Sequence, residues 1–512
     1  MLLLGGELSN SAATCVADID SVLPRMARAG LNTVLVPLQW DLTEPEEGHF
    51  DFSLLDETVR EARRNGLKVV LLWFGAWKNS MSCYVPQWVK RDWKRFPRAC
   101  GLSGRPLEMV TAFSPDLLSA DSTALTRLFA HLRATDSREQ TVVMVQVENE
   151  IGMLESARDH CALARQAYQA LMPTEAMKVF GLKKRCTWQQ ALGTGEEADE
   201  RFQAYWYARY VERLAHAVKQ VYGLPLYVNA ALNSRGRHPG QYPSAGPLAH
   251  LFSIWKKVAS DIDLFSPDIY DTGFKSWASQ YATADNPLFI PESRCCVNSG
   301  VRALYAFGAH EAVGFSPFAI DQSSPREVHE VSEAYGLIRQ MSPLLLKYRG
   351  QERLHGVLFD QQDREQTFAD AGISITCRHV FTLPWDSRAT DGSVWREGGA
   401  LILRLNAMEY IVAGSGVVVE FKSIADTAAQ HTQLGEDGFA LQGHFEGKQL
   451  SATHRNRGAR IGLASVNEVE VGADGSLHRL RSLNGDQTHQ GRHVRIGIDD
   501  YRILHVRLYT YE

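Results

Sequence analysis

The sequence predicts an α/β protein: a (β/α)8 TIM barrel followed by a β-sandwich-like domain. From the N-terminus to about residue 343, short apolar runs alternate with longer helical patterns, and their count of eight is the number that closes such a barrel. No GxGxxG follows the first apolar run and no GxxxxGK[ST] occurs, which disfavours an open nucleotide-binding sheet. Beyond residue 347 the helical periodicity fades and short β-branched runs take over.

We expect the barrel to span residues 1–346, with an insertion at about 153–200 that is too long for a simple connection. The eight expected strands are apolar runs, most of which end in polar or aromatic side chains. They cover Leu2–Leu8, Thr33–Leu38, Leu67–Trp73, Val142–Val147, Leu226–Ala230, Ile262–Ile269, Leu288–Pro291 and Ala312–Ala319.

The expected barrel helices carry apolar residues at three- and four-residue spacing, and Gly66 ends one of them. They cover Val16–Ala29, Phe52–Asn65, Leu117–Ala134, Phe202–Tyr222 and Glu327–Met341. The β-sandwich-like domain is expected over residues 347–512, because Gly-rich turns separate its strands. Those strands cover Ala400–Leu405, Tyr410–Val412, Val417–Phe421, Ile461–Ser465, Val494–Ile498 and Arg502–Tyr509.

Composition excludes several classes of function. The chain has 512 residues, a net charge of −5 and a pI near 6.4, so neither nucleic acid nor an anionic membrane is an expected partner. No run of 18 apolar residues predicts a membrane span. Eight scattered cysteines form no CxxC and no zinc-type cluster, so we expect no metal and no cofactor. The N-terminus lacks a signal-peptide pattern, which indicates a cytoplasmic protein as written, or a periplasmic one if a leader has been trimmed.

The segment VVMVQVENEIG, residues 142–152, carries the strongest functional signal. Its apolar start is typical of a strand buried on both faces, and it stops abruptly at Glu148, Asn149 and Glu150. Two carboxylates and an amide there are costly unless they are paired or used. In a parallel barrel the C-terminal ends of the strands carry the chemistry. The alternative is that these carboxylates are solvated loop charges.

A second carboxylate, Glu292, occupies the same setting at the end of the expected seventh strand. Carboxylates on the fourth and seventh strands face each other across the barrel mouth. That arrangement suits double-displacement glycoside hydrolysis, in which one carboxyl protonates the leaving oxygen and the other attacks the anomeric carbon from about 5–5.5 Å away. Tyr270 and Arg294 are candidates to stabilise an ionised Glu292.

The segment VQVENEIG resembles the acid/base motif of the β-galactosidases of glycoside hydrolase family 35, within the wider clan A of barrel glycosidases. The resemblance implies that Glu150, after Asn149, is the general acid/base and that Glu292 is the nucleophile. The segment VPLQWDLTEPEEGHFDF, which contains Trp40, is similar to the second-strand motif of families 35 and 42.

The chain resembles most closely a bacterial branch that carries a C-terminal β-domain. This resemblance rests on the segments GGELSNS, YIVAGSGVVVEF and RLRSLNGDQTHQGR. The chain departs from the common pattern at LLWFGAWKNS and at PESRCC. The resemblance therefore supports the type of reaction more than the sugar that is cleaved.

Further side chains at strand ends are candidate sugar ligands. Trp40 and Trp77 offer faces for stacking on a pyranose, with ordinary packing as the alternative. Glu7 is a candidate to bind sugar hydroxyls, Asn149 a candidate for the 2-hydroxyl, and Tyr270 a wall of the pocket.

The sequence thus predicts a retaining glycosidase that releases terminal β-D-galactosyl residues from oligosaccharides, with plant cell-wall side chains suggested by analogy alone. One alternative keeps the chemistry and changes the sugar to an arabinopyranoside or a fucoside. The other is a carbohydrate-binding protein on an inactive barrel. The expected partner is an oligosaccharide, and a homodimer is left open.

Overall fold

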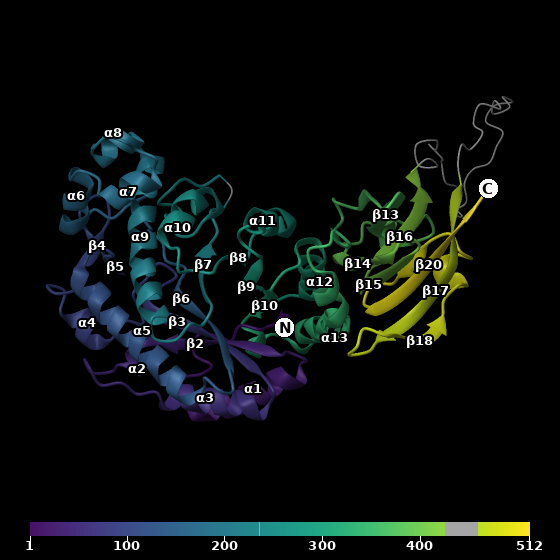
Figure 1. The fold of residues 1–512 in the computed structure, drawn as a ribbon, viewed down its shortest axis with the longest axis horizontal. Helices are drawn as coiled ribbons and strands as arrows, with labels where there is room; N and C mark the ends of the chain where they lie inside the picture. The colour runs from purple at the N-terminus through teal and green to yellow at the C-terminus, as the bar shows by residue number, and fades with distance from the viewer. Residues whose placement is uncertain (235, 425–458) are drawn as a thin grey trace. The chain divides into compact units, whose positions relative to one another are not determined.

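The structure is a computed structural model that describes residues 1–234, 236–424 and 459–512 (Figure 1). The chain divides into two compact units. One comprises residues 3–295 and 313–323, and we call it the barrel unit. The other comprises residues 1–2, 296–312 and 324–512, and we call it the β unit.

Parallel strands form the centre of the barrel unit. Eight of them pair in the order β1, β10, β9, β8, β7, β6, β3, β2. The backbone N–H of Leu8 donates to the carbonyl of Leu35, and that of Leu35 donates to Gly6, so the first strand also joins the second. This ring confirms the predicted TIM barrel. Its strands are β1 (Leu3–Leu4), β2 (Thr33–Gln39), β3 (Lys68–Lys78), β6 (Val142–Asn149), β7 (Leu226–Ala231), β8 (Leu264–Ile269), β9 (Phe289–Arg294) and β10 (Gly314–Phe318).

The inside of the ring is a packed core, as in other barrels of this kind. Inward-facing side chains from successive strands, such as Leu35, Leu72, Tyr227 and Phe289, form one buried cluster. Because both faces of each strand are covered, most strand residues are apolar, which is why their sequence signal is strong.

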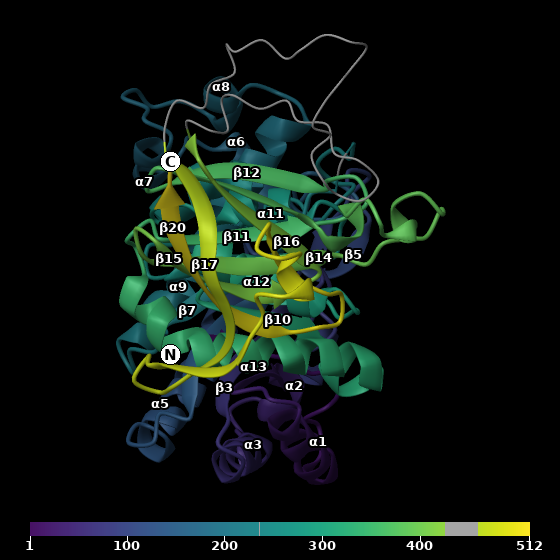
Figure 2. The same ribbon diagram turned by 90° about the vertical axis from the view of Figure 1, so that its right-hand side faces the viewer.

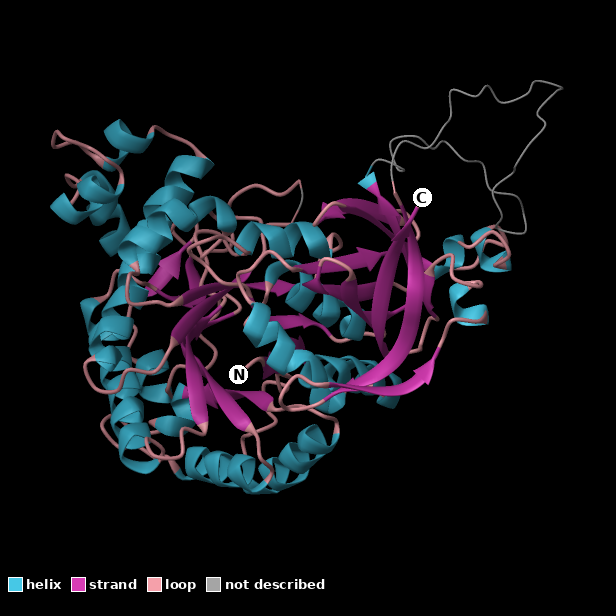
Figure 3. Ribbon diagram, turned by 45° about the vertical axis from the view of Figure 1, so that its right-hand side comes forward, coloured by secondary structure: helices cyan, strands magenta, loops and turns pink. Residues whose placement is uncertain are grey.

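Helices surround the ring, as Figure 3 shows. Some are amphipathic with acidic first turns and basic last turns, which favours the helix dipole. Among the residues that the structure describes, no helix is long and apolar enough to cross a membrane. The helices are α1 (Val16–Arg28), α2 (Trp40–Thr43), α3 (Ser53–Arg64), α4 (Gln87–Arg91), α5 (Pro115–Thr135), α6 (Ala162–Gln169), α7 (Thr174–Val179), α8 (Trp188–Leu192), α9 (Glu196–Lys219), α10 (Phe252–Val258) and α11 (Phe274–Tyr281).

The third strand differs most from its expected bounds. It was expected to end at Trp73 but continues to Lys78, with a register shift between these two residues. The shift pairs Lys78 with Asn149 on β6. A side chain at Gly75 would meet the indole nitrogen of Trp73 at 2.3 Å, so only glycine fits at the shift. A hairpin of β4 (Arg98–Cys100) and β5 (Pro106–Val110), which the sequence analysis did not expect, follows this strand.

The β unit contains two antiparallel sheets that share one core. Side chains of both sheets, among them Val357, Ile375, Val412 and Val419, meet in a single buried cluster. Figure 2 shows β17 and β20 side by side, in agreement with their pairing. One sheet contains β11 (Leu354–Phe359), β14 (Gly398–Asn406), β15 (Glu409–Ser415), β20 (Arg502–Tyr511), β17 (Arg460–Val471) and β18 (Leu477–Ser482). The other contains β12 (Glu365–Asp370), β13 (Ile373–His379), β16 (Val417–Ser423) and β19 (Val494–Ile496).

Two helices accompany these sheets. Helix α12 (Ser299–His310) follows β9 in the chain and packs on β11 and β14, and α13 (Pro325–Tyr348) packs on α12. Strands β11, β12, β13 and β18 were not expected from the sequence. For β12 and β18 the reason is that they are largely exposed and lack a long apolar run. The expected range 347–512 also includes residues 425–458, which lie outside the described part of the chain.

Asp136 fixes the start of β6, the strand that carries the candidate carboxylates. Its buried carboxylate accepts hydrogen bonds from the backbone N–H of Thr141 at 3.0 Å and of Val142 at 2.7 Å, and pairs with Arg63 at 2.5 Å. Removal of the carboxylate leaves these donors unsatisfied away from water.

We therefore expect Asp136→Ala to lower the free energy of unfolding by about 2–4 kcal/mol. Glu139→Ala in the same turn is the control, because Glu139 is exposed, and it should stay within about 0.5 kcal/mol of the parent. Urea denaturation measures both variants. Equal stabilities for the two would contradict this account of the start of β6.

Candidate active site

The end of β6 places the first candidate carboxylate. Glu150 is buried and adopts a left-handed backbone with φ of 46°. Its backbone N–H donates to the side-chain oxygen of Asn229, at the end of β7, at 2.9 Å. The side-chain amide of Asn79 donates to its carboxylate. These two contacts fix both the backbone and the side chain of Glu150.

Glu292, on β9, is the second carboxylate, and it is also buried. The Tyr270 hydroxyl donates a hydrogen bond to one of its oxygens. The β8–β9 register sets Asp268 beside Glu292. One carboxyl oxygen from each of Glu150, Asp268 and Glu292 lies within 4.8 Å of the others. The structure therefore brings the two predicted carboxylates together across the barrel mouth.

Two more charged groups share this mouth. Glu7, after β1, is buried, and the charge of Glu292 acts on its carboxyl. Lys78, at the end of β3, is only 5% exposed and feels the charges of Glu7, Glu150, Asp268 and Glu292. The mouth thus holds four carboxyls and one ammonium.

Burial and mutual repulsion raise the pKa values of three of these carboxyls. Burial, reinforced by the charge of Glu292, raises the pKa of Glu150 to about 7. Burial and neighbouring carboxylates raise the pKa values of Glu7 and Asp268 well above their ordinary range. For Lys78, burial lowers the pKa, but the surrounding carboxylates outweigh it and raise the pKa above its ordinary value. Near neutral pH, Glu150 can therefore carry a proton and give it up.

Several buried polar atoms of the mouth have no hydrogen-bond partner within the described residues. Both side-chain atoms of Asn149 are in this position, as are one oxygen of Glu7 and one of Glu292. Buried polar groups are normally satisfied, so unpaired ones are expected where a polar ligand binds. This set, with donors and acceptors close together, fits a ligand rich in hydroxyl groups.

The two predicted tryptophan platforms lie deeper. Trp40 is fully buried, and its indole N–H donates to Glu44 at 2.8 Å. Trp77 is also fully buried and packs edge-on against Tyr207 and Tyr210. In this structure both rings are enclosed by other side chains, and a stacking role for either stays a prediction.

Glu148 anchors the end of β3. Its carboxyl accepts from the backbone N–H of Trp77 at 2.8 Å, and the charge of the buried carboxyl of Asp121 acts on it. Asp121 in turn accepts from the indole N–H of Trp73 at 2.9 Å and from the hydroxyl of Tyr210 at 2.7 Å. Burial raises the pKa of Glu148 well above its ordinary range. The pair therefore ties the irregular part of β3 to the end of β6.

Three further polar side chains lie in or just after the barrel strands β7, β9 and β10. Asn229 holds Glu150 and also donates to Asp268 at 2.7 Å. Asp321 accepts from the backbone N–H of Ser9 at 2.7 Å, a local structural contact. Arg294 is exposed, with its guanidinium 5.9 Å from the centre of the Tyr270 ring.

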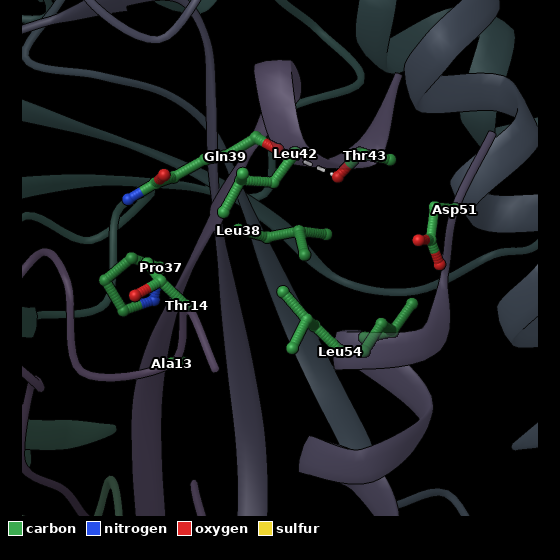
Figure 4. A pocket seen from close by; sticks show the side chains of 10 residues that line it. Ala13, Thr14, Pro37, Leu38, Gln39, Leu42, Thr43, Asp51 and Leu54 are labelled. Atoms are coloured by element: carbon green, nitrogen blue, oxygen red, sulfur yellow. Dashed lines mark hydrogen bonds between the residues drawn. The ribbon is translucent and has the colours of Figure 1, made fainter. Parts of the chain in front are cut away.

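A cavity of about 210 Å³ opens beside Glu150 and Asp268. Tyr270, Tyr242 and Arg237 also line it. A second cavity, seen in Figure 4, is lined by residues of β2, α2 and α3. At about 30 Å³ it is too small for a sugar and holds none of the carboxyls above. Of these two cavities, only the one at the mouth lies beside the carboxyls and has room for a sugar.

Sequence reasoning missed Lys78 and Asp268. Asp268 was noted only as part of a strand end, although a carboxylate after the apolar run LFSP is the same signal that identified Glu292. Lys78 was missed because the strand was expected to end five residues earlier. Its position after an apolar stretch interrupted only by Gly75 was the available signal.

Comparison with known proteins gives two family matches. A model of glycoside hydrolase family 42, described as "Beta-galactosidase", matches residues 15–192. A model described as "Domain of unknown function (DUF5597)" matches residues 331–495. The findings support a resemblance to β-galactosidases but give no support to family 35, and they point to family 42 instead. The two families share the second-strand motif around Trp40, which is why this motif does not separate them.

A curated "Beta-galactosidase" from Xanthomonas manihotis is 32% identical over 143 residues, which is 27% of this chain and 22% of that protein. A solved catalytic mutant of a family 42 β-galactosidase from G. stearothermophilus is 16% identical, with a TM-score of 0.50 over 67% of this chain and 57% of that one. A solved β-galactosidase from Halorubrum lacusprofundi is 18% identical, with a TM-score of 0.47 over 66% of this chain and 58% of that one. The chain thus spans less than two thirds of these relatives, and the likeness to the G. stearothermophilus structure concerns the fold alone.

The raised pKa of Glu150 makes stability depend on pH. Its carboxyl holds a proton to about pH 7 in the folded protein but only to about 4.5 when unfolded. Between these values the folded state binds more protons, so stability falls as the pH rises, and the loss is complete above pH 7.

We expect Glu150→Gln to gain stability relative to the parent between pH 4.5 and pH 8, by up to about 3 kcal/mol. Chemical denaturation at a series of pH values measures this difference. Glu139→Gln, at an exposed position, should show no such trend. A constant difference for Glu150→Gln across the series would contradict the raised pKa.

Proposed function

We propose that the protein is a retaining glycoside hydrolase acting on terminal β-D-galactosyl residues of oligosaccharides. The observation that carries the proposal is the pair Glu150 and Glu292, with carboxyl oxygens within 4.8 Å of each other. Retaining glycosidases hold their two carboxyls about 5–5.5 Å apart, whereas inverting ones leave about 6.5–9.5 Å for a water molecule.

In the first step, Glu150 gives its proton to the glycosidic oxygen while an oxygen of Glu292 attacks the anomeric carbon. The bond to the leaving alcohol breaks and a glycosyl ester on Glu292 forms. In the second step, Glu150 takes a proton from water, whose oxygen attacks the same carbon and releases Glu292 as a carboxylate. The pKa of about 7 suits Glu150 for both transfers.

Surrounding groups support Glu292 as the nucleophile. Tyr270 donates to one of its oxygens and leaves the other without a partner. Lys78 brings a positive charge close enough to interact with the charge of Glu292. Galactose is supported by the family 42 match and by the name of the Xanthomonas relative. A panel of aryl β-galactoside, α-arabinopyranoside and β-fucoside substrates tests the sugar.

We expect the parent to hydrolyse aryl β-galactosides and to release β-galactose first, as seen by proton NMR before mutarotation. Glu292→Ala and Glu150→Ala should each lower kcat at least about 10³-fold, because each removes a reacting group. Added azide should give α-galactosyl azide with Glu292→Ala and β-galactosyl azide with Glu150→Ala. Release of α-galactose, or full activity of Glu292→Ala, would refute the mechanism.

The activity should also depend on the proton of Glu150. Since Glu150 must be protonated to act as the acid, kcat/KM should fall as the pH rises above about 7. Rates measured from pH 4 to 10 with a substrate whose aglycone is a poor leaving group check this limb. A highly activated aryl galactoside needs less protonation, so Glu150→Ala should retain more of its activity on that substrate.

A further inference from the structure

Lys78 stands out among the charged groups of the barrel mouth. Its side chain is 5% exposed, and the charges of Glu292, Glu150, Glu7 and Asp268 all act on it. Yet its ammonium forms no hydrogen bond and no close ion pair with any described residue. Its Nζ lies 4.9 Å from the centre of the Phe74 ring, which supplies no hydrogen-bond acceptor.

Another largely buried cation of this protein is bonded directly. Arg302, whose side chain is 19% exposed, forms two hydrogen bonds to Glu397, at 2.7 and 2.6 Å. A structural lysine would be expected to do the same, because a buried ammonium with three unused donors is costly. The donors of Lys78 are therefore available to a ligand.

The backbone around Lys78 is held in place. The register pairs Lys78 with Asn149, whose side chain also lacks partners. Its own backbone N–H donates to the carbonyl of Met81 at 2.8 Å. The preceding residue, Trp77, is tied to Glu148. Strand β3 thus carries the ammonium to the end of β6 that holds Glu150.

We propose that Lys78 is a catalytic residue that donates a hydrogen bond from its ammonium to a hydroxyl of the sugar held between Glu150 and Glu292, and that its charge stabilises the ionised nucleophile. The proposal rests on the proposed function. A sugar hydroxyl accepts such a bond and carries no charge of its own, so the ligand is an uncharged sugar. Hydrogen bonds that involve a charged group are about twice as strong as neutral ones.

The test compares Lys78→Met, which keeps the length and removes the charge, with Lys78→Arg, which keeps the charge. Lys68→Met is the matched control, because Lys68 opens the same strand and bonds to the carbonyl of Gln140 at 2.7 Å. We expect Lys78→Met to lower kcat/KM for an aryl β-galactoside about 10- to 100-fold. Lys68→Met should stay within about twofold.

Deoxy substrates identify the contact. Aryl 2-, 3-, 4- and 6-deoxy-β-galactosides each lack one hydroxyl. When the missing hydroxyl is the one that Lys78 binds, the parent should be less active on the deoxy substrate than on the full substrate. Lys78→Met should hydrolyse these two substrates almost equally. If every deoxy substrate loses the same factor in both proteins, Lys78 contacts no sugar hydroxyl and the proposal is overturned.

The pH profile separates the charge from the contact. The charge of Lys78 lowers the pKa of Glu150, so the alkaline limb of kcat/KM should move to higher pH in Lys78→Met. Lys78→Arg should leave the limbs in place. An unchanged profile in Lys78→Met would overturn the electrostatic part. Should this variant fail to fold, as seen by circular dichroism, Lys78→Gln decides the same questions.

Failure of the proposed function has a different signature. If the parent hydrolyses no aryl glycoside but binds galactose by calorimetry, the hydrolase assignment fails. Weaker galactose binding by Lys78→Met, with Lys68→Met unchanged, then still supports the contact. If the parent neither hydrolyses nor binds, both proposals are overturned.

Discussion

The enclosure of one ammonium and four carboxyls at the mouth of a barrel is the constraint on which the site depends. Five ionised groups away from water would be very costly, so some must stay protonated or find a counter-charge. Burial and neighbouring carboxylates raise the pKa values of Glu7 and Asp268 well above their ordinary range, and Lys78 supplies a counter-charge. Glu150 is left to gain or lose a proton near neutrality. The division of roles among like groups thus follows from burial and distance.

A second constraint is the backbone at the end of β6. Glu148 and Glu150 both have positive φ, of 62° and 46°, a conformation that non-glycine residues rarely adopt. Such strain costs on the order of 1 kcal/mol or more and persists only where the surroundings enforce it. Here the enforcing contacts are Asn229 on the N–H of Glu150 and Trp77 on the carboxyl of Glu148. This backbone directs the carboxyl of Glu148 toward β3 and the carboxyl of Glu150 toward the mouth.

This geometry shows what the sequence could and could not predict. Buried parallel strands give long apolar runs, so the barrel and the carboxylates Glu148, Glu150 and Glu292 followed from the places where those runs stop. The choice of Glu150 over Glu148 came from the family resemblance. Lys78 did not follow, because its position depends on a register shift that only the contacts of Gly75 explain. The burial of Trp40 was equally hidden, since an aromatic residue at a strand end is compatible with either packing or binding.

The same reasoning applies to the β unit, where exposed strands such as β12 carry little apolar signal and were missed. Its glycines fix how one helix packs. A side chain on Gly356 of β11 would meet the backbone nitrogen of Ala309 at 2.3 Å, and one on Gly308 of α12 would meet the carbonyl oxygen of His355 at 2.9 Å. Helix α12 can approach β11 this closely only because both positions lack a Cβ.

In the sequence, helix α12 lies between the barrel strands β9 and β10. The chain leaves the barrel unit after Cys295, three residues beyond Glu292, forms α12 within the β unit, and returns at Val313 to build β10. The buried face of α12 is covered by β11 and β14, which come later in the sequence. A chain cut after residue 346 would therefore lose the strands that cover α12 and would expose its apolar residues. The strand that carries the proposed nucleophile and the last barrel strand are thus joined through a helix whose packing depends on the second unit.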